Sequence, residues 1–397
     1  MSDRDPVIVA AARTPFGKLG GSLSSVPAVD LGAHAIRVAL ERAGLDPAEV
    51  DQCIMGTVIT AGQGQIPARQ AALKAGIPAT TSALTVNKVC ASSLKAVNLA
   101  ALLIRAGEAE VVVAGGMESM SQAPMLLPGV RRGVAMGNLT LYDSMLWDGL
   151  TCPIDQVPMG DHGTEVAAEL GVSREEQDGY ALLSQQRYEA ARNQGLLADE
   201  LAPFEVSAKS GLVLVERDEQ PRPDTTLAKL AALRPVFGGP EGSVTAGNAP
   251  GINDGAAAIV IMSRGRALAL GIEPLARWVG YGESAAEHPY LATVPALALE
   301  RALDKTGGAV SAPDLKVVEI NEAFASVVIT SSRMLELDLA QVNPNGGAIA
   351  VGHPVGASGA RILAACVMQL RRQGGGLGAA TICSGTAQGE ATLVEVA

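Results

Sequence analysis

A cysteine at the boundary between two sequence patterns is the first residue that could carry chemistry. Cys90 lies within residues 86–96, where a β-rich stretch changes into an Ala- and Leu-rich helical pattern. A helix N-terminus offers free N–H groups and the positive end of the helix dipole, and both favour a thiolate. Ser92 and Ser93 add donors in the first turn. The segment predicts a reactive thiolate, and the alternative is a buried cysteine that serves as a small hydrophobic side chain.

Further reactive side chains lie in the C-terminal third. Asn321 begins Asn321-Glu322-Ala323-Phe324-Ala325, His353 lies in the glycine-rich segment 343–361, and Cys383 lies in segment 381–390. Together with segments 11–16, 115–120 and 245–248, these motifs resemble the thiolase family, specifically its short-chain acetyl-CoA acetyltransferases. Several long motifs in the family's order, along essentially the whole chain, are far more specific than one short pattern.

The resemblance implies a reversible, ping-pong condensation of two acetyl-CoA molecules to acetoacetyl-CoA and CoA. His353 accepts the proton of Cys90, whose sulfur takes the acyl group from the thioester. Cys383 removes an α-proton from the second thioester, and the enolate oxygen is stabilised by His353 and a water held by Asn321. Backbone N–H groups of Cys90 and Gly385 hold the oxyanion. Taken singly, His353 could cap a turn, Asn321 could start a helix, and Cys383 could be a core thiol.

The resemblance also implies a coenzyme A platform. Its contact residues are Leu150, Met159, Arg222, Leu233, Phe237, Ala246, Pro250 and Phe324. Arg222 suits phosphate or adenine, although a solvated ion pair is the alternative. The chain departs from the family where Gly385-Thr386-Ala387 replaces three glycines, Pro250 replaces a common serine, and Pro158 stands where a histidine often precedes Met159. These changes concern the shape of the pocket, so they leave the acyl chain length open.

Three rival functions follow from the same residues. A 3-ketoacyl-CoA thiolase of broader chain length, of the kind used in fatty acid β-oxidation, would need the same groups. A ketoacyl synthase shares the duplicated architecture but uses one cysteine with two histidines, and Cys383 stands where it would have a histidine. A non-catalytic CoA-binding protein would have no reason to keep every reactive group.

Composition excludes several classes of protein. Of 397 residues, 48% are hydrophobic and 3% aromatic, with 45 glycines, so helices and sheets can approach closely. This length favours two domains or one duplicated domain. The formal net charge of −11 argues against nucleic acid as a partner, because phosphate binding needs a basic face.

The cysteines and the N-terminus indicate the compartment. The five cysteines, at 53, 90, 152, 366 and 383, form no C-x-x-C pair and no zinc-like spacing, so no metal site is predicted. Their odd number fits a reducing compartment. The N-terminus lacks a signal or transit pattern, and no apolar run approaches the ~20 residues that span a bilayer. We expect a cytoplasmic protein without membrane association, with CoA thioesters as substrates and no resident cofactor.

Strands and helices alternate in the first and last thirds of the chain. The first third predicts strands at 7–11, 53–58, just before Cys90 and at 110–115, with helices at 28–43, 67–75 and after Cys90. The last third predicts strands at 275–281, 315–320 and near 383 and 394, with helices at 295–303, after 321 and at 357–371. This repeated order suggests an internal duplication in which the Cys90 turn corresponds to the His353 turn. Two independent βαβ domains are the alternative, but neither would hold a complete acid–base set.

The predicted fold class is α/β, with thiolase-like duplicated βαβ halves that form a five-layered α-β-α-β-α core and carry a long inserted loop domain. We divide the chain into an N-terminal half at 1–120, a loop domain at 121–247, the completion of the N-terminal half at 248–273 and a C-terminal half at 274–397. Within the loop domain, residues 125–147 resemble the loop through which short-chain thiolases assemble as dimers of dimers. This segment predicts a homotetramer, and the alternative is a flap packed on its own subunit.

Overall fold

The computed structural model describes residues 2–134, 136–208 and 211–397. The N-terminal half comprises β1 (Pro6–Arg13), β2 (Gly17–Lys18), α1 (Ala28–Ala43), β3 (Gln52–Gly56), α2 (Pro67–Lys74), β4 (Ser82–Val86), α3 (Ser92–Ala106), β5 (Val111–Ser119), β10 (Asn253–Ser263) and α7 (Arg264–Leu270). The C-terminal half comprises β11 (Ala276–Ala285), α8 (Val294–Asp304), β12 (Val317–Ile320), α9 (Ala325–Met334), α10 (Ala348–Val351), α11 (Ser358–Arg372), β13 (Gly376–Ser384) and β14 (Gln388–Val396). Between β5 and β10 lie β6 (Met125–Leu126), β7 (Tyr142–Asp143), α4 (Met159–Glu169), α5 (Arg174–Asn193), β8 (Phe204–Ala208), β9 (Gly211–Val215) and α6 (Leu227–Ala231).

The strands of both halves join into one bent sheet. Its order is β12-β13-β14-β11-β1-β10-β5-β3-β4, and β2 pairs with β10. The halves meet where β1 pairs with β11 through Val7 with Arg277 and Ile8 with Ala276. β3 runs parallel to β4 and β5, and β12 runs parallel to β13, as expected for strands linked by helical crossovers.

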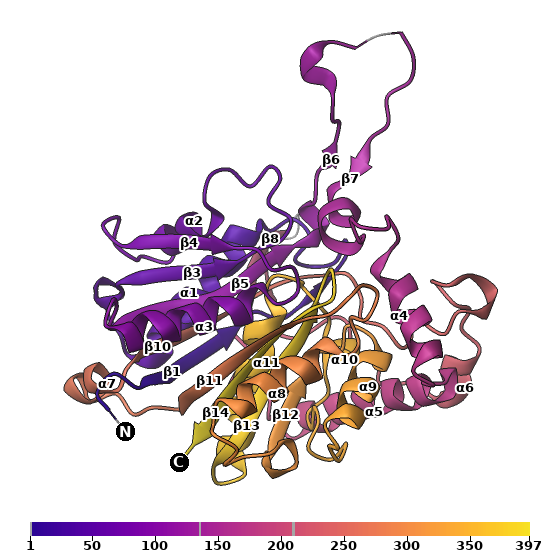
Figure 1. The fold of residues 1–397 in the computed structure, drawn as a ribbon. Coiled ribbons are helices and arrows are strands. Elements are labelled where there is room, and N and C mark those ends of the chain that lie inside the picture. The colour runs from indigo at the N-terminus through magenta and orange to yellow at the C-terminus, as the bar shows by residue number, and fades with distance from the viewer. Residues whose placement is uncertain (1, 135, 209–210) are drawn as a thin grey trace.

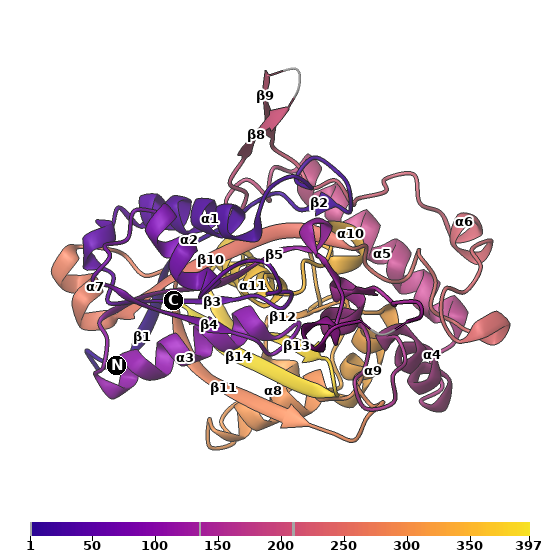
Figure 2. The same cartoon turned by 90° about the horizontal axis from the view of Figure 1, so that it is seen from above.

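Helices cover and separate the two halves of the sheet (Figures 1 and 2). Because side chains alternate along a strand, Val7 packs toward α1 and α2 on the outer face while Ile8 packs inward. The inward cluster contains Leu94 of α3 and Leu363 of α11, so these two helices form the middle layer. Leu299 of α8 lies in a third cluster on the outer face of the C-terminal half. The layers run α-β-α-β-α, as predicted.

The predicted elements agree closely with the observed ones. The first helix has the predicted bounds, Ala28–Ala43, and the helix after Cys90 begins at Ser92. β5 continues to Ser119, beyond the predicted end at Gly115. The helix that follows Asn321 begins at Ala325, so the alternative in which Asn321 starts that helix is wrong.

α3 corrects the expectation that no apolar run approaches the length needed to span a bilayer. Within the described part of the chain, the window Val89–Ala106 has the length and hydropathy of a membrane span, and more than half of it is buried inside the protein. It packs in the middle layer against β3, β5 and α11. Burial on several sides explains its composition, because a helix surrounded by other elements needs no polar face.

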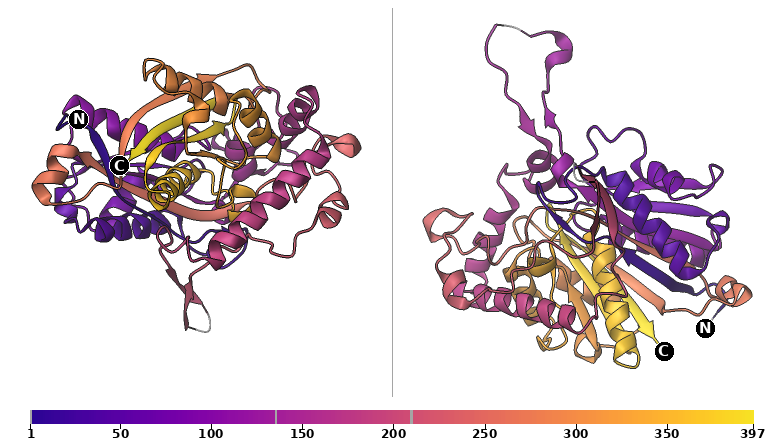
Figure 3. Two further views of the ribbon diagram at one scale, coloured as in Figure 1. Left: turned by 90° about the horizontal axis from the view of Figure 1, so that it is seen from below. Right: turned by 180° about the vertical axis from the view of Figure 1, so that it is seen from behind.

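An arm projects from the body between β6 and β7, on the side opposite the two termini (Figures 1 and 3). Its tip exposes large apolar side chains, including Val134, Met136, Leu139 and Leu141. Because these side chains are exposed on a projecting arm, the alternative in which the described part of the tip packs onto its own subunit is wrong. Ala135, inside the predicted assembly loop, lies outside the described residues. A second, shorter hairpin, β8–β9, also projects (Figure 2).

Candidate active site

A strained turn delivers Cys90 to the start of α3. Val89 has φ 43°, which is rare for a β-branched residue, and its N–H donates to Asn87 Oδ1 at 3.0 Å. The Ser92 hydroxyl donates to the Val89 carbonyl at 2.6 Å and accepts from the Lys88 N–H at 2.8 Å. The hydroxyl that the sequence suggested as a donor to the thiol thus holds the turn instead.

The two halves bring their turns together through α3 and α11. The Ala360 N–H donates to the Ser93 hydroxyl at 2.9 Å. A Cβ on Gly359 would lie 2.5 Å from the Leu94 nitrogen, so a glycine is required for the two helices to approach this closely. The N-terminal ends of both helices, one after Cys90 and one after His353, therefore lie against each other.

His353 is held in one tautomer. Its Nδ1 lies 2.6 Å from Ser358 Oγ, which donates its own proton to the Pro354 carbonyl at 3.0 Å. The hydroxyl must therefore accept from Nδ1–H, which leaves the lone pair on Nε2. Nε2 is buried and has no hydrogen-bond partner among the described residues. The backbone N–H of His353 donates to Asn253 Oδ1 at 2.9 Å.

Glu118 anchors the His353 turn to the N-terminal half. It is fully buried and accepts from the backbone N–H groups of Val58, Ile59 and Gly356 at 2.9, 3.1 and 3.0 Å. Burial raises its pKa to about 7, although these hydrogen bonds oppose the rise. The sequence reading missed Glu118 and Asn253 as positioning residues. Their signal, a polar side chain in an otherwise apolar strand, was present in both cases.

Electrostatics at the site differ from the sequence expectation. Burial raises the pKa of the Cys90 thiol to about 12, and the charge of Glu118 acts in the same direction. Burial lowers the pKa of His353 to about 3, helped by the charge of Arg361. Burial and the neighbouring Cys90 raise the pKa of Cys383. This direction runs against the expectation of a resting Cys90 thiolate, because desolvation opposes the effect of the helix N-terminus. At neutral pH the site holds two thiols and an uncharged imidazole.

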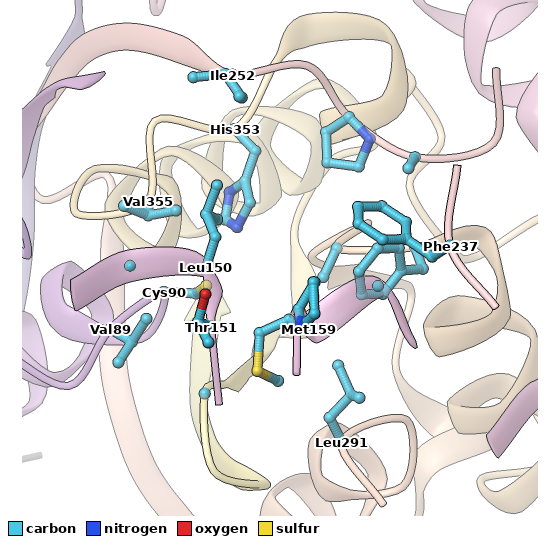
Figure 4. A pocket seen from close by; sticks show the side chains of 18 of the residues that line it. Val89, Cys90, Leu150, Thr151, Met159, Phe237, Ile252, Leu291, His353 and Val355 are labelled. Carbon is cyan, nitrogen blue, oxygen red and sulfur yellow. The ribbon is translucent and has the colours of Figure 1, made fainter. Parts of the chain in front are cut away.

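One apolar pocket collects these groups. Cys90, His353, Cys383 and Gly385 all line a cavity of about 410 Å³, a size typical of small-molecule sites. Figure 4 shows Cys90 and His353 on one side of the cavity and Met159, Phe237 and Leu291 on the other. Cys383 comes from the end of β13, and Gly385 from the turn that follows it.

Asn321, also predicted as a catalytic residue, is not among the residues that line this pocket; it is fully buried between β12 and α9. Its side-chain oxygen and nitrogen have no hydrogen-bond partner among the described residues. An orphaned amide is costly in a protein interior, so the position suits a bound water. The adjacent Glu322 is fully paired: it accepts from Tyr180, Ser184 and the Ile349 N–H at 2.8 Å each and thereby fixes the segment before His353.

Six of the eight predicted CoA contacts line the same pocket: Leu150, Met159, Phe237, Ala246, Pro250 and Phe324. Arg222 and Leu233 do not. Arg222 Nη1 donates to the carbonyl of pocket-lining Ala246 at 3.0 Å, which places its guanidinium at the rim. Leu233 packs behind the wall, where its side chain would contact a Cβ on Gly247.

Two thiols and one uncharged imidazole around an apolar pocket, at the junction of duplicated halves, define a cysteine-dependent acyltransferase. The chain belongs to the thiolase family. Residues 6–265 match the thiolase N-terminal domain and residues 272–396 match the thiolase C-terminal domain. The family resemblance found in the sequence is therefore confirmed.

Curated and solved relatives cover nearly the whole chain. The acetyl-CoA acetyltransferases of Pseudomonas aeruginosa and Cupriavidus necator are 48% and 47% identical, each over 98% of this chain and 98% and 99% of their own. A probable acetyl-CoA acyltransferase of Staphylococcus epidermidis is 46% identical over 98% of both chains. The structure of human mitochondrial 3-ketoacyl-CoA thiolase matches with a TM-score of 0.95 at 42% identity over 100% of both chains. The protein is accordingly an enzyme with thiolase activity.

Proposed function

We propose that the protein catalyses the reversible reaction of two acetyl-CoA molecules to acetoacetyl-CoA and CoA. The observation that carries this proposal is the convergence of Cys90, Cys383 and His353 on one apolar pocket. Forming a carbon–carbon bond between thioesters requires one acyl group held covalently and a carbanion made from the other. A nucleophilic thiol, a base for the α-proton and a proton carrier meet those needs.

In the first half-reaction, His353 Nε2 takes the proton of Cys90 as the sulfur attacks the thioester carbonyl. A new carbon–sulfur bond to Cys90 forms and the bond to CoA breaks. His353 then passes the proton to the departing CoA sulfur. Because the pKa of His353 is lowered to about 3, the imidazole is in its basic form before the reaction and readily gives up the proton afterwards.

In the second half-reaction, the uncharged His353 takes the proton of the Cys383 thiol, and the resulting thiolate removes an α-proton from acetyl-CoA. The resulting carbanion attacks the acyl carbonyl on Cys90, the new carbon–carbon bond forms, and the bond to the Cys90 sulfur breaks. His353 then gives the proton that it took from Cys383 to the released Cys90 thiolate, while Cys383 keeps the α-proton, so both thiols and the uncharged imidazole are restored. Thiolysis is the same sequence in reverse.

The developing negative charges need fixed donors. We assign the acyl oxyanion to the backbone N–H groups of Cys90 and Gly385, both at the pocket wall. The enolate oxygen is assigned to His353 and a water held by Asn321, whose amide is buried and unpaired among the described residues. Arg222, at the rim, is assigned to the phosphates or adenine of CoA, and the pocket-lining residues to its pantetheine arm.

Separate assays of the half-reactions test this assignment. Cys383→Ala should still take up acetyl groups from radiolabelled acetyl-CoA but lose at least ~10²-fold in turnover of acetoacetyl-CoA plus CoA, because it lacks the base for the α-proton. Cys90→Ala should lose both reactions. Cys53→Ala, which removes a buried thiol far along the chain from the pocket segments, is the matched control and should retain both. Near-normal turnover by Cys383→Ala would remove Cys383 from the mechanism.

A second candidate is a 3-ketoacyl-CoA thiolase of broader chain length. It is favoured by the 42% identity to the human enzyme of that name. Thiolysis rates for 3-ketoacyl-CoAs of increasing chain length distinguish the two, since a sharp fall beyond four carbons supports the acetyl-specific enzyme. A flat profile supports the broader one.

We further propose a cytoplasmic homotetramer, built as a dimer of dimers, that needs no resident cofactor for the reaction. Five free cysteines support a reducing compartment. The edge strand β4, with Leu84 exposed, offers an unpaired backbone edge for a first interface. The apolar tip of the arm supports a second interface.

A further inference from the structure

Four polar side chains that the proposed reaction does not use converge beside the pocket wall. Cys152 Sγ, a carboxylate oxygen of Asp155 and a ring nitrogen of His162 all lie within 4.8 Å of one another. Asp155 Oδ2 lies 2.6 Å from His162 Nε2 and 4.0 Å from His288 Nε2. The groups come from three separate segments of the chain: the loop after Leu150, helix α4 and the loop after β11.

This combination of donors is typical of a zinc site. Thiolate, imidazole and carboxylate are the ligands that Zn²⁺ takes in proteins. With Zn–N of about 2.0 Å and Zn–S of about 2.3 Å, tetrahedral ligand atoms lie about 3.3 to 3.6 Å apart. The separations among Cys152, Asp155 and His162, from 2.6 Å up to at most 4.8 Å, span that range. His288 lies outside this group of three: its Nε2 is 4.0 Å from Asp155 Oδ2 and its ring centre is 6.2 Å from that of His162, so it would have to move toward the ion to become the fourth ligand. Two anionic and two neutral ligands would balance the charge of the cation.

Burial divides the four groups into a fixed pair and an accessible pair. Cys152 and His162 are buried, while the side chains of Asp155 and His288 are 34% and 38% exposed. The buried pair is held by the protein around it. The accessible pair leaves a path by which an ion can enter.

We propose that Cys152, Asp155, His162 and His288 form a structural zinc site. The segments that it would join also carry Thr151, Met159 and Leu291, which line the catalytic pocket (Figure 4). The ion fixes the wall that holds the acyl-CoA and takes no part in acyl transfer. These ligands are scattered over residues 152–288 without a zinc-like spacing, so the sequence by itself predicts no metal site here.

The rival explanation is a hydrogen-bonded Asp155–His162 pair that closes the loop without metal. Titration of the chelator-treated, full-length protein with Co²⁺, a spectroscopic substitute for Zn²⁺, separates the two. We expect one Co²⁺ per chain, with tetrahedral d–d bands and a thiolate-to-cobalt charge-transfer band that Zn²⁺ abolishes. A hydrogen-bonded pair alone gives neither band.

Variants assign the ligands. Cys152→Ala should lose the charge-transfer band, and His288→Ala, at a partly exposed position that should not disturb folding, should weaken Co²⁺ binding at least ~10-fold. Cys90→Ser should keep the band, and His34→Gln, which changes a histidine outside the cluster, should keep the affinity. Zn²⁺ should also raise the melting temperature of the unsubstituted protein but not that of Cys152→Ala.

Absence of a tetrahedral spectrum, or a charge-transfer band that survives in Cys152→Ala, would overturn the zinc site. The readout is metal binding and not turnover. A negative result in the Co²⁺ titration would therefore not affect the proposed acyl transfer. A negative result in the acyl-transfer assays would likewise not affect the zinc site, which is tested by the Co²⁺ spectrum alone.

Discussion

At the scale of single residues, we expect the reactivity of Cys90 to depend on His353 and not on the helix that follows the cysteine. The thiol is protonated at rest because burial raises its pKa to about 12. A neutral imidazole with its lone pair on Nε2 provides the base, since Ser358 fixes Nδ1 as the donor. Proton transfer can therefore accompany attack on the thioester instead of preceding it.

The pH dependence of alkylation tests the protonated thiol. A raised pKa means that the thiolate fraction grows with pH, so the rate at which iodoacetamide labels Cys90 should rise about tenfold per pH unit up to about pH 9, past the ordinary cysteine pKa of about 8.5. Peptide mass mapping of labelled protein gives the rate at Cys90, and glutathione under the same conditions is the reference thiol. A rate that is already constant near pH 7 would indicate a resting thiolate and contradict the expectation.

Ser358 should act as a positioning residue. In Ser358→Ala the imidazole can adopt either tautomer, so we expect kcat/KM to fall about 10-fold, a part of the ~10²–10⁴ that general acid–base catalysis supplies. Ser331→Ala is the matched control, because Ser331 is equally buried and donates to the Ala292 carbonyl at 2.9 Å. Ser358→Ala loses two buried hydrogen bonds, with His353 Nδ1 and the Pro354 carbonyl, and Ser331→Ala loses one, so thermal unfolding of both variants measures how much stability each change costs. If Ser358→Ala and Ser331→Ala lose activity equally, Ser358 has only a structural role.

At the scale of elements, the β13–β14 hairpin holds Cys383 and Gly385 with a strained turn. Thr386 and Ala387 have φ 59° and 49°, in the left-handed region that favours glycine. Gly385 lies opposite Val89, which has a positive φ of its own in the Cys90 turn. Cys90 and Cys383 thus each lie beside a turn with strained backbone.

Replacing one strained residue by glycine should stabilise the hairpin. Ala387→Gly removes a left-handed penalty of about 1–2 kcal/mol and adds an entropic cost of about 0.5–1 kcal/mol, so we expect a net gain of up to ~1.5 kcal/mol in the free energy of unfolding. Urea unfolding at fixed protein concentration measures it. Ala379→Gly, inside β13 itself, should instead be destabilising. A loss of stability in Ala387→Gly would show that the turn is not strained there.

Local pattern predicts most of the elements but not the electrostatics of the site. The apolar period along 28–43 and 92–106 predicts α1 and α3 because each helix buries a face or more against the sheet. The raised pKa of Cys90 could not be predicted, because it depends on desolvation by segments far away in sequence, together with Glu118. The cluster around Asp155 could not be predicted from the sequence for the same reason, because its residues come together only after three separate segments pack against one another.

The resemblance to a family supplied what periodicity could not. It named Cys90, Asn321, His353, Cys383 and Gly385 together, and the structure places all of them except Asn321 on the wall of one pocket. It also named Arg222 and Leu233, which lie at the rim and behind the wall. The roles of all these residues, and the division of the chain at 120, 247 and 273, remain predictions.

At the scale of the whole molecule, the arm between β6 and β7 is the feature that the single chain does not explain. Met136, Leu139 and Leu141 are more than half exposed at its tip, far from the core (Figure 1). Apolar side chains gathered on such a projection favour burial against another surface. The edge strand β4 gives a second unpaired surface on the body of the molecule.

Removing the tip should therefore halve the assembly without unfolding it. With residues 131–141 replaced by a short glycine linker, light scattering should give the mass of a dimer where the intact protein gives a tetramer, because the apolar contact of the arm is lost while β4 remains. Acetyl uptake by Cys90 should persist, since the deleted residues do not line the pocket.

A charge on the other surface provides the matched control. Leu84→Lys places an ammonium on the exposed edge of β4, where lysine blocks strand pairing, and should break the dimer contact while leaving the arm intact. Leu84→Lys should then also give a dimer, but one whose two chains are held together by their arms. Combining Leu84→Lys with the deletion of residues 131–141 should give monomers. An intact protein that is already a dimer, or a deletion that leaves the tetramer unchanged, would show that the arm serves some purpose other than assembly.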